Sequence, residues 1–164
     1  MIVIADATPL NYLILIRQAD LLPELFTNVL IPPAVWAELE HVKAPDPVRA
    51  WIQGPPSWLT MQTLNTPPDS SLNHLDPGER EAIALAEQIR ADQLLLDETE
   101  ARQEAARRNL PFIGTLGVLR EAARRDLISL PSVLADLQNT SFFVDPILIR
   151  SLLDEDAGRK MIRP

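Results

Sequence analysis

The sequence contains no cysteine, which excludes disulfide bonds, thiolate metal sites and a cysteine nucleophile. Histidine is nearly absent, and because His41 and His74 both lie in proline-rich stretches, a histidine-based catalytic centre is not expected. No apolar run approaches the roughly 20 residues that span a bilayer. The N-terminus opens on a strand pattern without the basic start and cleavage site of a secretory signal. We therefore expect a cytoplasmic protein with no place in a membrane.

Lysine is also scarce, since only Lys43 and Lys160 are present and the remaining basic residues are arginines. The formal net charge of −8 argues against broad, non-specific nucleic-acid binding without excluding a specific site. Two arginine clusters, at 102–108 and 120–125, are expected mainly on solvated helix faces. Arg102 is the candidate for phosphate binding, because the arginine fork offers two parallel hydrogen bonds to a phosphate.

What is present is an alternation of apolar strands and amphipathic helices, the pattern of an α/β fold. With 164 residues, 46% of them hydrophobic, the chain has the length and composition of one globular domain over 1–164. Strands are expected at 2–5, 29–31, 93–97 and 111–113, with a possible edge strand at 58–64. Helices are expected to begin near Pro9 and Pro32 and to cover 77–90, 98–108, 115–125, 131–139 and 145–155. A proline-rich insert at about 43–76 is expected to be irregular at 43–57 and 65–77.

Four acidic residues stand where a strand ends or a helix begins: Asp6, Glu38, Glu79 and Asp97. Asp6 and Asp97 each follow a short apolar strand. Ligands bind at the carboxyl ends of parallel strands, so these two carboxylates are expected side by side if their strands are neighbours. Two further acids from helices would complete a set of hard oxygen ligands for Mg²⁺ or Mn²⁺. Because crowded carboxylates repel one another, such a cluster indicates a cation.

Each of these acids also has a purely structural interpretation. An aspartate after a buried strand is often the N-cap of the next helix, which suits Asp97 and also Asp6, with Thr8 close behind it. Glu38 lies at the margin of a buried helix face, where a surface glutamate is common.

The third acid can be Glu79 or Glu81. At about 100° of rotation per residue, Glu79 falls about 60° from Ala82, close to the stripe that faces the sheet. Glu81 falls about 100° away on the other side and is expected to face solvent. Helical phase therefore favours Glu79 and leaves Glu81 as the fallback.

Five segments together resemble the PIN-domain nucleases, especially the compact bacterial and archaeal members that include the VapC-type toxins, and most of all one PIN-like subfamily. The resemblance covers roughly residues 1–128. The segments are Ile4-Ala-Asp-Ala-Thr-Pro-Leu10, Ile31-Pro-Pro-Ala-Val-Trp-Ala-Glu-Leu39, Gly78-Glu-Arg-Glu-Ala-Ile-Ala-Leu-Ala86, Leu96-Asp-Glu-Thr-Glu-Ala-Arg102 and Gly114-Thr-Leu-Gly-Val-Leu119.

The resemblance implies a three-layer α/β/α fold with a central twisted parallel sheet, whose acids bind Mg²⁺ or Mn²⁺ at its carboxyl edge. It implies an endoribonuclease that hydrolyses RNA to 5′-phosphate and 3′-hydroxyl ends and acts as the toxin of a toxin–antitoxin pair. The implied partners are the RNA substrate, a small antitoxin protein and a second copy of the chain in a homodimer.

Carried over residue by residue, the resemblance assigns catalysis to Asp6, Glu38, Glu79 and Asp97, with Asp6, Glu79 and Asp97 as the metal ligands. Glu79 stands 18 positions before Asp97, as in the VapC-type toxins. Thr115 matches a hydroxyl that lies near the metals, although it is equally suited to cap helix 115–125.

The chain departs from the VapC pattern in two ways. Position 79 carries a glutamate in place of an aspartate, which lengthens the reach to a metal. A further acid normally follows the one at Asp97, and here Glu98 or Glu100 must fill that role.

Receiver domains and haloacid-dehalogenase-type phosphatases also cluster acids at a strand end. Both need a lysine on a late strand, and neither Lys43 nor Lys160 is so placed. The phosphatases need a second aspartate where this chain has Thr8. The remaining alternative is a catalytically silent PIN-like fold that acts as a binding or regulatory module.

Apolar residues near the N-terminal helices exceed what one helix face can bury against a sheet, which predicts an interface. The alternative is that the 43–75 insert covers them. The residues are Leu10, Tyr12, Leu13, Leu21 and Leu22.

Overall fold

The chain divides into two compact units, Met1–Thr115 and Leu116–Pro164, and the computed structural model describes residues 1–162. All the acids singled out in the sequence belong to the first unit. The two units are described separately.

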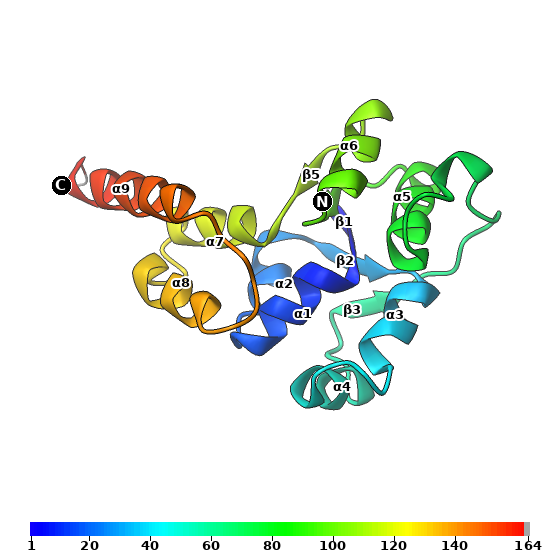
Figure 1. Ribbon diagram of the computed structural model, residues 1–164, viewed down its shortest axis with the longest axis horizontal. Helices are drawn as coiled ribbons and strands as arrows, with labels where there is room; N and C mark the ends of the chain where they lie inside the picture. The colour runs from blue at the N-terminus through cyan, green and yellow to red at the C-terminus, as the bar shows by residue number, and fades with distance from the viewer. Residues whose placement is uncertain (163–164) are drawn as a thin grey trace. The chain divides into compact units, whose positions relative to one another are not determined.

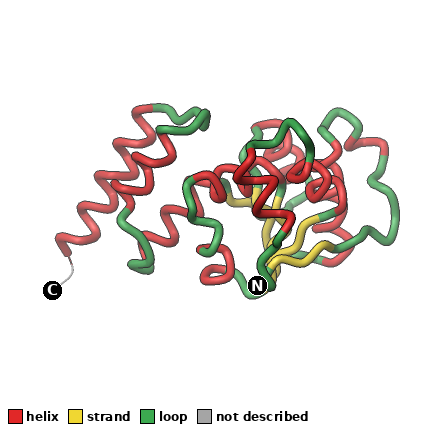
Figure 2. The backbone as a smooth tube through the Cα atoms, turned by 90° about the horizontal axis from the view of Figure 1, so that it is seen from below, coloured by secondary structure: helices red, strands yellow, loops and turns green. Residues whose placement is uncertain are grey.

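The first unit contains a five-stranded sheet in the order β3-β2-β1-β4-β5 (Figure 1), and every neighbouring pair of strands is parallel. Figure 2 shows helices on both sides of the strands. The predicted three-layer α/β/α fold with a central parallel sheet is therefore confirmed. The strands are β1 (Ile2–Ala5), β2 (Asn28–Ile31), β3 (Leu59–Met61), β4 (Gln93–Leu95) and β5 (Phe112–Ile113).

The central strand β1 is apolar along its whole length because helices cover both faces of the sheet. Ile2 and Ile4 join the core that α5 and α6 contribute on one face. Successive side chains of a strand point to opposite faces, so Val3 and Ala5, both fully buried, face the other layer. The helices of the unit are α1 (Ala7–Leu15), α2 (Leu21–Leu25), α3 (Pro33–Glu40), α4 (Asp46–Gln53), α5 (Pro77–Ile89) and α6 (Thr99–Arg107), with a short 3-10 turn η1 (Ser70–Leu72).

The prediction that residues 43–57 are irregular is wrong, because α4 lies inside this stretch. Its proline, Pro47, stands in the first turn, where a helix needs no backbone N–H from that residue. Val48 and Ile52 are buried and lie one turn apart on the apolar face of α4. The predicted edge strand within 58–64 is confirmed as β3.

The predicted surplus of exposed apolar side chains near the N-terminus is also wrong. Leu10, Leu13 and Leu22 are fully buried, Leu21 is nearly so, and Tyr12 is half-buried. Helix α1 packs against α3 and also against α4, which lies in the insert, so the insert covers the face of α1 that the sheet does not cover. These residues therefore provide no interface for another chain.

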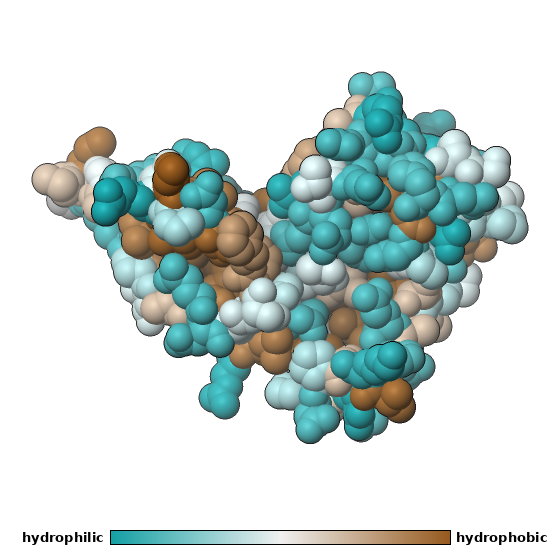
Figure 3. All heavy atoms as spheres, viewed as in Figure 1, coloured by the Kyte–Doolittle hydropathy of each residue, from teal (hydrophilic) through white to brown (hydrophobic). Residues whose placement is uncertain are grey.

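The second unit consists of most of α7 (Thr115–Arg124), then α8 (Leu130–Gln138) and α9 (Pro146–Ile162), with α8 packed on α9. Figure 3 shows hydrophobic side chains gathered on this unit and hydrophilic ones over α5 and α6. Phe143 and Ile147 are among the exposed apolar residues. Among the described helices, none combines the length and hydropathy needed to cross a membrane.

Candidate metal centre

The acids that follow β1 and β4 stand at the centre of the sheet. The two strands are parallel neighbours, with Ala5 opposite Leu95, and the backbone N–H of Asp6 donates to the Leu95 carbonyl over 3.0 Å. The chain leaves β1 toward β2 on one side and leaves β4 toward β5 on the other. Such a reversal of strand order opens a crevice at the carboxyl ends of the two strands, where α/β proteins bind their ligands.

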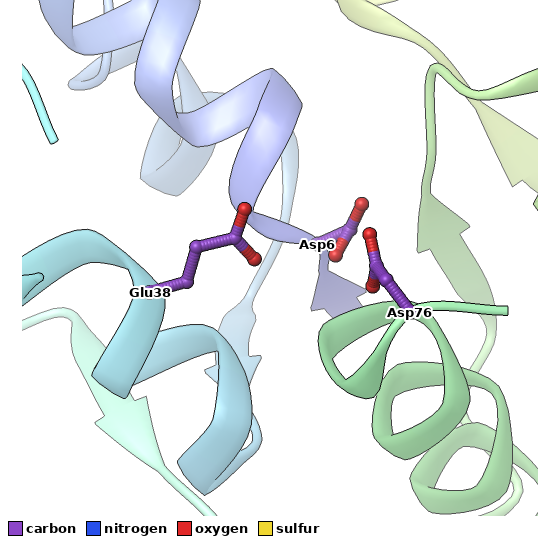
Figure 4. Close-up of side chains that lie close together, drawn as sticks. All are labelled: Asp6, Glu38 and Asp76. Atoms are coloured by element: carbon purple, nitrogen blue, oxygen red, sulfur yellow. The ribbon is translucent and has the colours of Figure 1, made fainter. Parts of the chain in front are cut away.

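Three carboxylates converge at this crevice, those of Asp6, Glu38 and Asp76 (Figure 4). One oxygen from each lies within 4.8 Å of the others. Asp6 comes from the β1–α1 junction, Glu38 from the last turns of α3, and Asp76 from the residue before α5. Asp6 is buried whereas Glu38 and Asp76 are exposed, so the cluster is open to solvent on one side.

Asp6 is the buried member of the cluster, with 2% of its surface exposed. Its Oδ1 is the one buried side-chain oxygen or nitrogen within residues 1–162 that has no hydrogen-bond partner. Burial raises the pKa of Asp6 well above its ordinary value, an effect that the Ala7 backbone N–H partly offsets and that the charges of Asp76, Glu79 and Glu38 increase.

A capping role does not explain Asp6, although it occupies the N-cap position of α1. Apart from the Ala7 backbone N–H, no donor of α1 makes a capping hydrogen bond to the Asp6 side chain in the described part of the chain. An unpartnered buried oxygen among other carboxylates is the environment that a cation would satisfy.

Gly78 leaves the space between the acids open. A Cβ at this position would lie 3.1 Å from Oδ1 of Asp6 and 3.2 Å from Oε2 of Glu38. A glycine here lets the backbone of α5 approach the carboxylates closely. Burial also raises the pKa of Glu38, and the charges of Asp76 and Glu98 raise it further.

Asp76 is a cluster member that the sequence analysis missed. Its Oδ1 accepts the backbone N–H of Glu79 over 2.8 Å, and Oε2 of Glu79 accepts the backbone N–H of Asp76 over 3.1 Å, which is a capping box. The sequence signal was an acid followed three positions later by a glutamate at the start of a helix. The cap uses only one carboxylate oxygen of Asp76, so the other is available to a cation.

Glu79 lies at the inner margin of the cluster and is 6% exposed. Burial raises its pKa, the backbone N–H of Asp76 partly offsets this, and the charges of Asp76, Glu98 and Glu38 add to it. Glu79 therefore lies close enough to the three converging acids to feel their charge, although it is not one of the three. Its assignment as a metal ligand stays a prediction.

The prediction that Glu81 faces solvent is wrong. Its Oε2 accepts the backbone N–H of Ala34 over 2.7 Å, so it satisfies a free donor at the start of α3. Helices α3 and α5 pack against each other, which covers the side of α5 that carries Glu81.

Asp97 is held by two groups of Thr115. The backbone N–H of Thr115 donates to Oδ1 of Asp97 over 2.8 Å, and its hydroxyl donates to Oδ2 over 2.6 Å. Within residues 1–162, Asp97 is not part of the group of three converging carboxylates. Its role as a ligand, and that of Thr115 beside the metal, stay predictions.

Arg102 also lies beside Asp97, with Nη2 3.6 Å from Oδ1. Its Nε donates to the carbonyl of Leu96 over 2.9 Å, and its guanidinium lies over the ring of Phe112 at 5.6 Å. A Cβ on Gly114 would lie 1.8 Å from Nη2 of Arg102, so a side chain at this position would displace the guanidinium. No sequence pattern predicted this packing.

The remaining predicted accessory residues surround the crevice. Glu98 precedes α6, and its charge raises the pKa of both Glu38 and Glu79, which places it beside the cluster. Glu100 is exposed in the first turn of α6. Thr8 is half-buried in the first turn of α1.

Comparison with known proteins gave two findings. The family model DUF3368, described as a PIN domain, matches residues 2–158. A solved structure of a PilT N-terminus domain protein from the hyperthermophilic archaeon Sulfolobus solfataricus P2 is similar in fold, with a TM-score of 0.50 and 12% sequence identity over 88% of this chain and 100% of that one. None of the curated proteins matches the chain significantly.

Proposed function

The chain belongs to the PIN-domain family, and from that premise we propose that it is a divalent-metal-dependent endoribonuclease that hydrolyses RNA phosphodiester bonds. The observation that carries the proposal is Asp6, whose buried Oδ1 has no hydrogen-bond partner and whose carboxylate converges with those of Glu38 and Asp76, one oxygen from each lying within 4.8 Å of the others. A buried carboxylate surrounded by like charges is costly unless a cation neutralises it.

The donor set fits a hard divalent cation. Asp6, Glu38 and Asp76 offer only carboxylate oxygens, which suit Mg²⁺ or Mn²⁺, and Gly78 keeps the space between them free of a side chain. When bound, such a cation polarises the scissile phosphate, lowers the pKa of a coordinated water and stabilises the leaving 3′-oxygen. Glu79 and Asp97 are further candidate ligands.

The chain's own residues have distinct parts in the proposed reaction. Glu38 is exposed and accepts a hydrogen bond from the attacking water, which orients the water toward the phosphorus. Arg102 is fixed by Leu96 and Phe112 and keeps a partly exposed guanidinium for the RNA phosphate. The cluster would repel RNA without a cation, so cleavage should depend strictly on metal.

Product analysis tests the proposed function. We expect the purified protein to cut single-stranded RNA with Mn²⁺, to leave 5′-phosphate and 3′-hydroxyl ends, and to stop when EDTA is added. Asp6→Asn should abolish cleavage, whereas Asp136→Asn, a change at an exposed residue of α8, should not affect it. A protein that binds Mn²⁺ but cuts no RNA would favour the silent binding or regulatory module instead.

Family resemblance supports a biological role that goes beyond the chemistry. We propose that the protein acts in the cytoplasm as a homodimeric toxin that a small antitoxin protein inhibits. A small DNA-binding protein encoded next to this chain should co-purify with it and suppress its nuclease activity. A monomer in light scattering at micromolar concentration would contradict the homodimer.

A further inference from the structure

A pocket of about 450 Å³ opens beside the acid cluster and shares Glu38 with it. Its size lies within the roughly 300–1,000 Å³ of small-ligand sites. Helices α1, α3 and α4, which contact one another, line it together with the α3–α4 connection and Glu98, the residue before α6. Glu38 belongs both to the pocket wall and to the acid cluster, so a ligand in the pocket would lie next to the scissile phosphate.

The pocket wall has the chemistry of a site for a flat ring with polar edges. Tyr12 contributes an aromatic ring, Leu39 and Val48 contribute aliphatic surface, and Asn11 contributes an amide with both a donor and an acceptor. Proteins recognise unpaired RNA bases by stacking them on aromatic rings and bonding their edges.

His41 adds a defined hydrogen-bond donor to this wall. Its Nδ1 accepts the backbone N–H of Lys43 over 3.0 Å, so in the neutral imidazole the proton is on Nε2. Lys43 also lines the pocket, is exposed and forms no ion pair with any residue in 1–162, so its ammonium is available to a phosphate.

The charge of the wall excludes a simple anion site. Glu38 and Glu98 both line the pocket, and their carboxylates repel a phosphate that enters it without a cation. A base carries no charge and can occupy the interior, while the phosphate attached to it lies near Lys43.

We propose that this pocket binds one unpaired nucleotide of the RNA next to the cleaved bond and that Asn11 selects its base. This inference rests on the proposed function, since it names how the same site chooses where RNA is cut. It makes single-stranded RNA the substrate and predicts a base preference at one position beside the cut.

Binding of single nucleotides tests the pocket without any cleavage. Calorimetry with the four ribonucleoside 5′-monophosphates, in EDTA, should show that one of them binds more tightly than the others. Asn11→Ala should weaken the binding of that nucleotide by about tenfold. Lys43→Ala should weaken the binding of all four nucleotides alike, because it removes a contact to their phosphate. Asn65→Ala, at an exposed asparagine outside the pocket, is the matched control and should change nothing.

Equal binding of all four nucleotides and of inorganic phosphate would overturn the proposal, and so would binding that Asn11→Ala leaves intact. Alanine is a better helix former than asparagine, so this variant of α1 should stay folded, which thermal unfolding can verify.

Sequencing of the ends cut from a randomised RNA separates the two proposals. Wild type should show one preferred base, and Asn11→Ala should lose that preference. Metal-dependent cleavage without any base preference would refute the proposed nucleotide pocket and leave the proposed nuclease function standing. Selective nucleotide binding without any cleavage would refute the nuclease and leave the pocket only as a nucleotide-binding site.

Discussion

Replacing Asp6 with asparagine should stabilise the protein when no metal is present. Two unit charges 4.8 Å apart repel by about 0.9 kcal/mol in water and by about 3.5 kcal/mol at an effective dielectric constant of about 20. Glu38 and Asp76 are exposed, so solvent screening favours the lower figure. We expect Asp6→Asn to raise the free energy of unfolding by about 1 kcal/mol at pH 7, or about 2–4 °C in Tm.

This gain should depend on pH. Because the pKa of Asp6 is raised in the folded state, the wild type loses stability as the pH rises from the ordinary value of 3.8 through the folded pKa. Below the ordinary value the carboxyl is protonated in both states, and the advantage of Asp6→Asn should disappear.

Metal should reverse the order of stability. At a Mn²⁺ concentration 100 times its Kd, wild type should gain about 2.7 kcal/mol by mass action, and Asp6→Asn should gain little. Thermal unfolding of both proteins with EDTA and with Mn²⁺ measures the effect, with Asp136→Asn as the exposed control. An apo variant less stable than wild type would refute the repulsion argument and show that Asp6 stabilises α1.

Three further substitutions test other contacts of the first unit. Glu79→Gln should weaken Mn²⁺ binding and RNA cleavage sharply and keep its capping bond. Glu81→Gln should leave both functions nearly intact and lower the free energy of unfolding by about 0.3–1 kcal/mol, through the bond at the start of α3. The opposite result in parallel assays would show that the wrong glutamate was chosen. Arg108→Ala removes ion pairs with Asp69 and Glu87 and one of the two arginine partners of the nearly buried Glu104, which keeps Arg107, and should destabilise the fold by about 1 kcal/mol. Hydrogen bonds from Ser71 and Arg108 lower the pKa of Asp69 to about 2, so the contribution of Asp69 to stability is present above pH 3.8 and is lost as the pH falls toward 2. Urea titrations should show that Arg108→Ala reduces this loss of stability in acid. An unchanged pH profile would contradict the role given to the Asp69–Arg108 pair.

The sheet could be predicted because its strands are short apolar runs that stay apolar on both faces, as in β1 and β4. Helix α4 could not, since Pro45 and Pro47 suggest a loop until the second is recognised as a first-turn proline. The same omission produced the false surplus of apolar residues on α1, because α4 is what covers that helix.

Asp6 and Glu38, two of the three converging acids, were predicted as site residues, although Glu38 was predicted as a catalytic residue and not as a metal ligand. Asp76 was missed because helical phase applies only to residues inside a helix, and Asp76 stands one residue before α5. The bonds between Asp97 and Thr115 join residues 18 positions apart, and they depend on where β5 ends beside β4. No local pattern carries that information.

Calorimetric titration with Mn²⁺ is the most direct test of the central claim that Asp6, Glu38 and Asp76 hold a divalent cation. Wild type and Asp136→Asn should bind Mn²⁺ alike, and Asp6→Asn and Asp76→Asn should each weaken binding by at least about tenfold, as loss of one ligand or its support does. Equal Mn²⁺ affinity in all four proteins, or no binding by wild type at millimolar concentration, would contradict the account.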